Sequence, residues 1–169
     1  AGFRYAVLLG MGGSSLAPLV FATTFGRAPG CPELIVLDST DPEALKSVTA
    51  RIDIEKTLFI VSSKSGSTIE PLSLFEYFHA SLEKIKGAES RRNFIAITDP
   101  DTPLEGFARK YRFRKVFANP KDIGGRFSAL SYFGLLPAAI TGIDIKRLLE
   151  HSSRVDSVLQ PCATSIANP

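Results

Sequence analysis

Short apolar runs alternate with helical patterns along the whole chain of 169 residues. Runs rich in β-branched and aromatic residues predict five strands: Tyr5 to Leu9, Leu34 to Leu37, Leu58 to Val61, Phe94 to Ile97 and Lys115 to Phe117. Amphipathic or apolar segments between and after them predict helices over Ser15 to Phe25, Asp41 to Arg51, Thr68 to Lys86, Pro103 to Lys110, Ala129 to Ile140 and Asp144 to Leu159. Continuous apolar strands are typical of a parallel sheet covered on both faces. The pattern predicts a single domain over residues 1–169, a doubly wound α/β sandwich of three layers around a five-stranded parallel sheet.

Two local patterns add detail. Asp41 is a suitable N-cap for the second helix because Pro42 follows it at the first helical position. Between 109 and 115 the chain carries five basic residues interleaved with two aromatic ones. The alternation from Tyr111 to Arg114 resembles a short strand with one buried and one solvated face. Since no nucleic-acid motif accompanies this basic run, we expect a solvated face and no nucleic-acid partner.

Composition restricts the class of protein. Hydrophobic residues make up 44% and charged residues 22%, which is typical of a soluble globular domain. The two cysteines, Cys31 and Cys162, are far apart and have no His or Cys neighbours at metal-ligand spacing, so we expect reduced thiols and no metal site. No signal peptide is visible, and the first apolar stretch runs directly into glycines. We therefore expect a cytoplasmic protein without a membrane partner.

Polar, glycine-rich loops follow three of the predicted strands. They run from Gly10 to Ser15, from Ser62 to Thr68 and from Asp122 to Ser128. Right-handed crossovers place the C-terminal ends of parallel strands on one edge of the sheet, where ligands of such folds bind. The three loops are therefore expected to form one site.

The first two loops have the chemistry of a phosphate site. Glycines let the backbone approach an anion closely, and a helix N-terminus favours negative charge; tight packing is the structural alternative for the first loop. In the second loop hydroxyls are concentrated at the start of the longest predicted helix, beside Lys64, and hydroxyls supply donors for phosphate oxygens. A capping box, in which Ser67 caps the helix and Glu70 reaches back, is the alternative there, and the two interpretations are compatible.

The third loop places Arg126 beside Gly124 and Gly125. A guanidinium holds an oxyanion in a fixed fork, and the glycines leave room for a ligand. A structural salt bridge is the alternative for this arginine.

At these residues the sequence resembles the phosphoglucose isomerase family, whose domains belong to the wider sugar isomerase (SIS) class. LGMGGSSLAP is similar to the family's GIGGSxLGP loop, and residues 63–68 fit the SIS pattern S-x-S-G-x-T in its isomerase form. IGGRFSALSYFGLLP, from Ile123 to Pro137, resembles the family signature V/I-G-G-R-Y/F-S. Together the three motifs span most of the chain.

The resemblance implies an SIS-type sheet and the cofactor-free interconversion of glucose 6-phosphate and fructose 6-phosphate, a step of glycolysis and gluconeogenesis. It implies roles for eight residues, with Ser63, Lys64, Ser65 and Thr68 at the substrate phosphate, Gly13, Ser14 and Gly125 along the sugar, and Arg126 at the enediolate. A prepositioned cation suits an intermediate in which negative charge develops.

The family's catalytic base is a glutamate in a Q-x-x-x-E-S-x-G motif, assisted by a histidine and a lysine, and no such motif occurs before Pro169. We therefore expect one SIS domain of a longer isomerase, which would pair with a second SIS domain, form a homodimer, and be inactive without its other half. Glu70 matches a family position but not the base, and we expect His79 and His151 to be ordinary packed or surface residues. Lys121 departs from the acidic or small polar residue usual in the signature.

Two other functions remain open at this point. A non-catalytic SIS domain that senses a sugar phosphate would share the same loops. An NAD-binding oxidoreductase domain would use Gly10-x-Gly12 and Asp38, but its third glycine falls at Ser15 and the hydroxyl cluster has no part in it.

Overall fold

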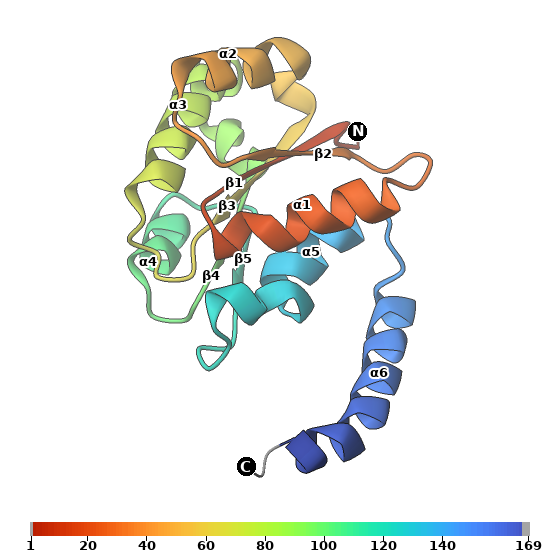
Figure 1. Ribbon diagram of the computed structural model, residues 1–169. Helices are drawn as coiled ribbons and strands as arrows, with labels where there is room; N and C mark the ends of the chain where they lie inside the picture. The colour runs from red at the N-terminus through yellow and green to blue at the C-terminus, as the bar shows by residue number, and fades with distance from the viewer. Residues whose placement is uncertain (1, 167–169) are drawn as a thin grey trace.

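The computed structural model describes the backbone of residues 2–166 and the side chains of residues 2–157. Its centre is a five-stranded, all-parallel sheet in the order β2-β1-β3-β4-β5 (Figure 1). The strands are β1 (Tyr5–Gly10), β2 (Glu33–Leu37), β3 (Thr57–Ser62), β4 (Phe94–Thr98) and β5 (Lys115–Ala118). The five predicted strands and their parallel arrangement are confirmed, each within one residue at either end.

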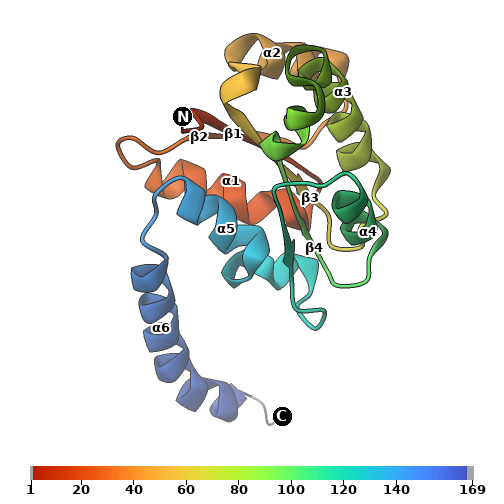
Figure 2. The same cartoon turned by 180° about the vertical axis from the view of Figure 1, so that it is seen from behind.

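Helices cover both faces of this sheet, as Figures 1 and 2 show. One face carries α2 (Pro42–Arg51), α3 (Ile69–Lys86) and α4 (Pro103–Lys110), and the other carries α1 (Gly13–Phe25) and α5 (Tyr132–Ile140). Each face has its own hydrophobic core. Because successive strand residues point to opposite faces, Val7 and Leu9 belong to the core beneath α2, α3 and α4, and Ala6 and Leu8 belong to the core beneath α5. The structure thus confirms the three-layer, doubly wound arrangement.

An aromatic cluster fills the core beneath α3. Phe75 contacts Phe94 with ring centroids 4.9 Å apart and Phe113 at 5.1 Å, and Phe59 stacks on Phe78 at 4.6 Å. Such pairs add about 0.5–1.5 kcal/mol each beyond the burial of their area. This core anchors α3, which begins directly after the loop that follows β3.

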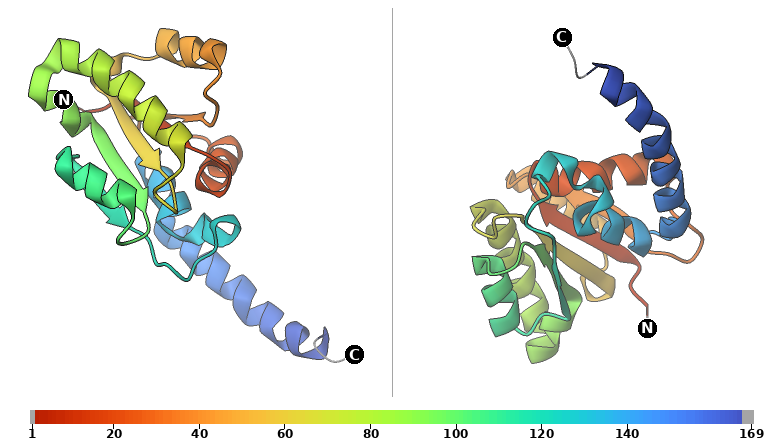
Figure 3. Two further views of the ribbon diagram at one scale, coloured as in Figure 1. Left: turned by 90° about the vertical axis from the view of Figure 1, so that its left-hand side faces the viewer. Right: turned by 90° about the horizontal axis from the view of Figure 1, so that it is seen from below.

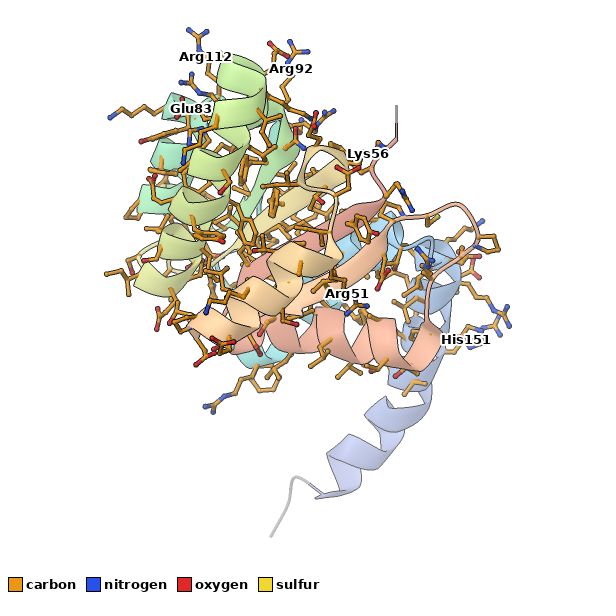
Figure 4. All side chains as sticks on the ribbon, turned by 90° about the horizontal axis from the view of Figure 1, so that it is seen from above. Arg51, Lys56, Glu83, Arg92, Arg112 and His151 are labelled. Atoms are coloured by element: carbon orange, nitrogen blue, oxygen red, sulfur yellow. The ribbon has the colours of Figure 1, made fainter. Side chains whose placement is uncertain are left out.

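The two histidines lie in different surroundings, one in the core and one at the surface. His79 is buried and stacks on Phe75 at 5.1 Å, so it is a packed residue. His151 is exposed on α6 (Ile145–Ile166), a helix that extends away from the body of the domain (Figure 3). In Figure 4 it lies beside the C-terminal end of α1, where it lines a hollow of about 600 Å³ together with Arg27 and Arg147.

Two local predictions are wrong. Residues 111–114 do not form a strand, because Tyr111 ends α4 and Arg112 turns the chain with a φ of 55°. That turn lets the Phe113 amide bond to the Ala108 carbonyl at 2.9 Å. The alternation of burial nevertheless holds, since Phe113 is buried while Arg112 and Arg114 are exposed (Figure 4 shows Arg112 pointing outward).

The helix predicted from Ala129 is also divided. A 3-10 helix, η3 (Gly125–Leu130), comes first, and Ser131 then caps α5 by accepting a hydrogen bond from the Phe133 amide. Two further short 3-10 helices, η1 (Ile54–Lys56) and η2 (Gly87–Asn93), precede β3 and β4. The predicted Asp41 cap is confirmed, because its carboxylate accepts from the Glu43 and Ala44 amides at 2.8 and 3.1 Å.

Three observations bear on the predictions from composition. Cys31 is a free thiol, whereas the side chain of Cys162 lies outside the described residues. Across the described residues, no helix combines the length and the apolar character that crossing a bilayer requires. Within that same part of the chain, no group of three or more His, Cys, Asp or Glu side chains is placed to hold a metal ion.

Candidate functional site

Four loops enclose a hollow of about 400 Å³ at the C-terminal edge of the sheet. They gather at the lower left in Figure 1, where α1, α3 and η3 begin. The hollow is lined by Met11, Gly13, Ser14, Lys64, Ser65, Thr68, Asp99 and Gly125. The three loops singled out in the sequence therefore do converge, and the loop after β4 joins them.

The first and third loops touch through their backbones. A Cβ atom at Gly13 would lie 2.6 Å from both the carbonyl carbon and the oxygen of Gly125, so only glycine fits there. The Ser128 hydroxyl lies within hydrogen-bond distance of both carbonyls, 3.1 Å from Gly13 O and 2.6 Å from Gly125 O. Close packing explains Gly13 physically, and it also brings Gly125 to the rim of the hollow.

The start of α1 has no side chain to cap it. Its N-cap is Gly12, which adopts a φ of 53°, and the Ser14 amide turns back to the Met11 carbonyl at 3.1 Å. Ser62 at the end of β3 donates its hydroxyl hydrogen bond to the Ser14 carbonyl at 3.1 Å. The first loop is thus fixed against the neighbouring strand, and the Ser14 and Ser15 amides at the start of α1 bond to the backbone carbonyls of Met11 and Gly12.

The second loop gathers its hydroxyls around a tight turn. Ser63 Oγ donates to Thr68 Oγ1 at 3.0 Å and accepts from the Gly66 amide at 3.2 Å. Ser67 Oγ donates to Ser65 Oγ at 3.1 Å. Gly66 has a φ of 67°, which favours glycine. The turn places the Ser65 and Thr68 side chains at the hollow, with Ser63 directly behind them.

The capping box considered for α3 is not formed. The helix begins at Ile69, its N-cap is Thr68, and that side chain makes no capping hydrogen bond. Ser67 instead bonds to Ser65. The Ile69 and Glu70 amides therefore keep their hydrogen-bonding capacity, since these groups have no partner inside a helix, whereas Pro71 has no amide hydrogen. An uncapped helix N-terminus at a cluster of hydroxyls is a ready site for an anion.

Lys64 lies at the hollow, but its ammonium already has partners. It forms an ion pair with Asp99 Oδ2, and Nζ also donates to the Lys121 carbonyl at 3.1 Å. The side chains of this pair are only 28% and 13% exposed, so the pair is mostly shielded from water. The second oxygen, Asp99 Oδ1, is buried and has no hydrogen-bond partner among the described residues.

A second lysine links the rims of two loops. Lys121 Nζ lies 2.9 Å from Asp101 Oδ2 in an exposed pair. The hydrogen bond from Lys121, followed by its charge, lowers the pKa of Asp101, and the same contact raises the pKa of Lys121. Lys121, which departs from the family signature, thus forms an ion pair with Asp101.

Arg126 and Ser63 stand apart from the lining. Ser63 is only 4% exposed and reaches the hollow through its bond to Thr68. Arg126 follows Gly125 on η3, is exposed, and does not line the hollow. Among the described residues no ion pair involves Arg126, so the structural salt bridge does not account for it.

Sequence reasoning missed Met11 and Asp99, which both line the hollow. The signal for Asp99 was present, because it follows β4 at the same sheet edge as the other loops. Its loop, however, lacks the glycines that mark the other three loops. The loop holds itself together through Thr102, which bonds to Thr98 Oγ1 at 2.7 Å and caps α4.

Comparison with known proteins gives matches along nearly the whole chain. The family model described as phosphoglucose isomerase matches residues 3–167. A glucose-6-phosphate isomerase from Carboxydothermus hydrogenoformans is 41% identical over 157 residues, which cover 87% of this chain and 34% of that protein. The chain thus spans about a third of that relative's length.

Solved structures give the same result. A hypothetical protein from Thermus thermophilus superposes with a TM-score of 0.86 at 38% identity, over 94% of this chain and 38% of that one. A glucose-6-phosphate isomerase from Chlamydia trachomatis superposes with a TM-score of 0.73 at 33% identity, over 84% and 27% of the two chains. With a family match over nearly all of its residues, this chain belongs to the phosphoglucose isomerase family.

Proposed function

We propose that this chain is the sugar-phosphate-binding domain of a glucose-6-phosphate isomerase. The observation that carries the proposal is the convergence of three glycine- and hydroxyl-rich loops on one hollow. Family membership supports the reaction, the interconversion of glucose 6-phosphate and fructose 6-phosphate.

In this proposal the second loop binds the substrate phosphate. The hydroxyls of Ser65 and Thr68 face the hollow, and Ser63 orients Thr68 from behind. The open first turn of α3 adds amide donors and the positive end of the helix dipole. Lys64 contributes through the backbone of the same turn.

The rest of the substrate would lie along the first and third loops. Gly13, Ser14 and Gly125 border the hollow with little side-chain bulk, which leaves room for a sugar chain. Arg126, one residue beyond Gly125, would stabilise the enediolate that forms when a proton moves between C1 and C2. Its exposed guanidinium has no ion pair among the described residues to compete for it.

The proton itself needs a base that this chain does not offer at the hollow. Asp99 is the carboxylate in the lining, and it is paired with Lys64. We propose that the base comes from a second SIS domain of a longer polypeptide, which forms a homodimer. The chain's 34% share of its Carboxydothermus relative is consistent with a larger enzyme.

Ligand titration tests the phosphate-binding part of this proposal. We expect fructose 6-phosphate to bind this chain weakly, fructose without phosphate to bind far more weakly, and NAD not to compete. Binding of NAD at the first loop would instead support the oxidoreductase alternative. A sensor domain would bind the sugar phosphate equally well, so an isomerase assay of the complete polypeptide separates enzyme from sensor.

The role of Arg126 has a separate test in the complete polypeptide. Arg126→Lys keeps the charge but loses the planar fork of the guanidinium. We expect kcat to fall more than KM rises, because the interaction strengthens as negative charge develops. An unchanged kcat would remove Arg126 from the reaction.

A further inference from the structure

Lys64 stands where a phosphate-binding lysine is expected, yet its contacts point elsewhere. Its side chain extends from the loop after β3 to Asp99 in the loop after β4 and to the Lys121 carbonyl in the loop after β5. One ammonium therefore joins three of the four loops around the hollow. A direct bond to phosphate would compete with both of these contacts.

We propose that Lys64 and Asp99 are positioning residues, and that their ion pair holds the Gly124-Gly125-Arg126 segment in register with the hydroxyl loop. This inference rests on the proposed function, since it assigns the hydroxyls and not the ammonium to the phosphate. Lys64 fixes the start of the third loop by donating to the Lys121 carbonyl, three residues before Gly124.

Burial explains why this pair can fix the loops. Its side chains are 28% and 13% exposed, so water screens the attraction less than in a surface pair. Asp99 is itself held in place, because its amide donates to the Lys64 carbonyl at 3.3 Å and its carbonyl accepts from Thr102 Oγ1 at 3.0 Å. The two loops are thus tied by both main-chain and side-chain contacts.

A second contact repeats the connection on the outside. Lys121 pairs with Asp101, joining the loops after β4 and β5 a second time. That pair is 60% and 84% exposed, and exposed pairs contribute little. The shielded Lys64–Asp99 pair is therefore the principal connection and the Lys121–Asp101 pair the lesser one.

Charge gives a way to separate positioning from direct binding. If Lys64 binds phosphate, Asp99 competes for the ammonium and repels the anion, so Asp99→Asn would tighten phosphate binding. If the pair positions the loops, Asp99→Asn removes the connection and impairs the reaction. The two roles thus predict changes in different quantities for one isosteric substitution: a lower inhibition constant of phosphate if Lys64 binds it, and a lower kcat if the pair positions the loops.

The test uses the complete polypeptide, with kcat and KM for fructose 6-phosphate and the inhibition constant of inorganic phosphate as readouts. The variants are Lys64→Met, Asp99→Asn, their double variant and Lys64→Arg, with Lys46→Met and Glu43→Gln from an exposed pair on α2 as matched controls. We expect each single variant to lower kcat roughly tenfold, and the double variant to be no worse than either, because partners in one contact are not additive.

We further expect the inhibition constant of phosphate to change less than about threefold in Asp99→Asn, while Lys64→Arg recovers part of kcat by keeping the charge. A phosphate constant that falls in Asp99→Asn and rises tenfold or more in Lys64→Met would overturn the proposal. So would single-variant losses in kcat that multiply in the double variant.

Failure of the proposed function remains distinguishable from failure of this inference. A wild-type polypeptide that neither isomerises fructose 6-phosphate nor binds phosphate refutes the function. The positioning role is then decided by hydrogen–deuterium exchange of residues 121–127. Faster exchange of this segment in Asp99→Asn than in Glu43→Gln supports the connection between the loops, whereas equal exchange contradicts it. Because this comparison does not use Lys64→Met, it decides the question even if that variant does not fold.

Discussion

The α-helices of this domain begin in two different ways: α2, α4 and α5 have a side-chain cap, whereas α1 and α3, which begin at the hollow, have none. Away from the hollow, α2 and α5 are capped by the side chains of Asp41 and Ser131. At the hollow, α1 and α3 have no side-chain cap, and the 3-10 helix η3 has none either. A side-chain cap typically stabilises a protein by about 1 kcal/mol. Both α-helix starts at the hollow forgo this stabilisation, but they differ in their amides: those of Ser14 and Ser15 in α1 bond to backbone carbonyls, whereas the first amides of α3 stay available.

A helix start with a side-chain cap stabilises the fold, whereas a helix start without one can bind a ligand. A side-chain cap satisfies amides of the first turn, while a start without one leaves them to another backbone group, a ligand or water. Two uncapped α-helices pointing at one hydroxyl-lined hollow favour an anion there. Substitutions that exchange one type of start for the other therefore test the account most sharply.

The largest effect is expected from Thr68→Asp, which gives α3 the type of start that α2 has. The new carboxylate would accept from the Glu70 amide and repel a phosphate, so we expect affinity for fructose 6-phosphate to fall by about 100-fold or more. The thermal midpoint should stay the same or rise, because a negative charge suits this helix end. Calorimetric titration and thermal unfolding measure the two effects. Thr68→Asn adds a cap without charge and should lie between; retained affinity in Thr68→Asp would refute an anion at this helix.

Gly13→Ala should damage both properties. Its Cβ would meet the Gly125 backbone at 2.6 Å, which forces the first and third loops apart. Overpacking of this kind costs about 1–3 kcal/mol in the free energy of unfolding, and we expect sugar-phosphate binding to be lost with it. Urea unfolding and ligand titration check both. Gly106→Ala is the control, since nothing lies within 4 Å of its Cβ position on α4 and alanine is the better helix former.

Ser63→Ala should weaken binding and also lower stability, because the buried Gly66 amide loses its acceptor. The change removes the hydroxyl that orients Thr68, and a neutral hydrogen bond contributes about 0.5–1.5 kcal/mol, so affinity should fall by up to roughly tenfold. Ser81→Ala is the matched control on α3, because its hydroxyl bonds only to the Tyr77 carbonyl in the hydrogen bonds described. Equal affinities for the two variants would remove Ser63 from the site.

Asp41→Ala tests the other side of the comparison. It removes the cap of α2, and we expect the free energy of unfolding to fall by about 1 kcal/mol while affinity for fructose 6-phosphate is unchanged. Chemical unfolding followed by circular dichroism provides the measurement. A loss of affinity as large as that of Ser63→Ala would show that the two types of helix start are not functionally distinct.

The smallest effect is expected from Lys121→Met at the rim. The folded-state pKa of Asp101 is lowered by Lys121, so the contribution of this carboxylate is present above its unfolded pKa and is lost as the pH falls through the lowered value. The pKa of Lys121 is raised, so its contribution is lost only as the pH rises through that raised value. In Lys121→Met the free energy of unfolding should therefore depend slightly less on pH in acid than in the wild type. This difference should shrink at high salt. A difference from wild type that grows with salt would contradict this pair as its cause.

Most of the fold could be predicted from the sequence because buried parallel strands leave a strong signal. Runs such as Leu58 to Val61 are apolar throughout, and β3 is buried along its whole length. The turn at Arg112 could not be predicted, since a left-handed arginine depends on the packing of Phe113 and not on its own preference. Because Phe113 is buried between the exposed Arg112 and Arg114, the sequence there has the alternation typical of a strand although the backbone turns.

The candidate site, like the fold, could be predicted only in part. Loop positions followed from the parallel topology, which brings the ends of all strands to one edge. Contacts between loops did not, because Asp99 gives no local signal and its pairing with Lys64 spans 35 positions. The uncapped start of α3 was also hidden, since Ser67 and Glu70 have the spacing of a capping box.

The most direct test of the central claim is a ¹⁵N NMR titration of this chain with fructose 6-phosphate and, separately, with fructose. We expect the amides of residues 12–14 and 63–70 to shift with fructose 6-phosphate only, while those of Glu43 and Ala44 at the capped start of α2 stay unmoved. Equal shifts with both sugars, or shifts concentrated away from the hollow, would contradict a phosphate site at the uncapped helix starts.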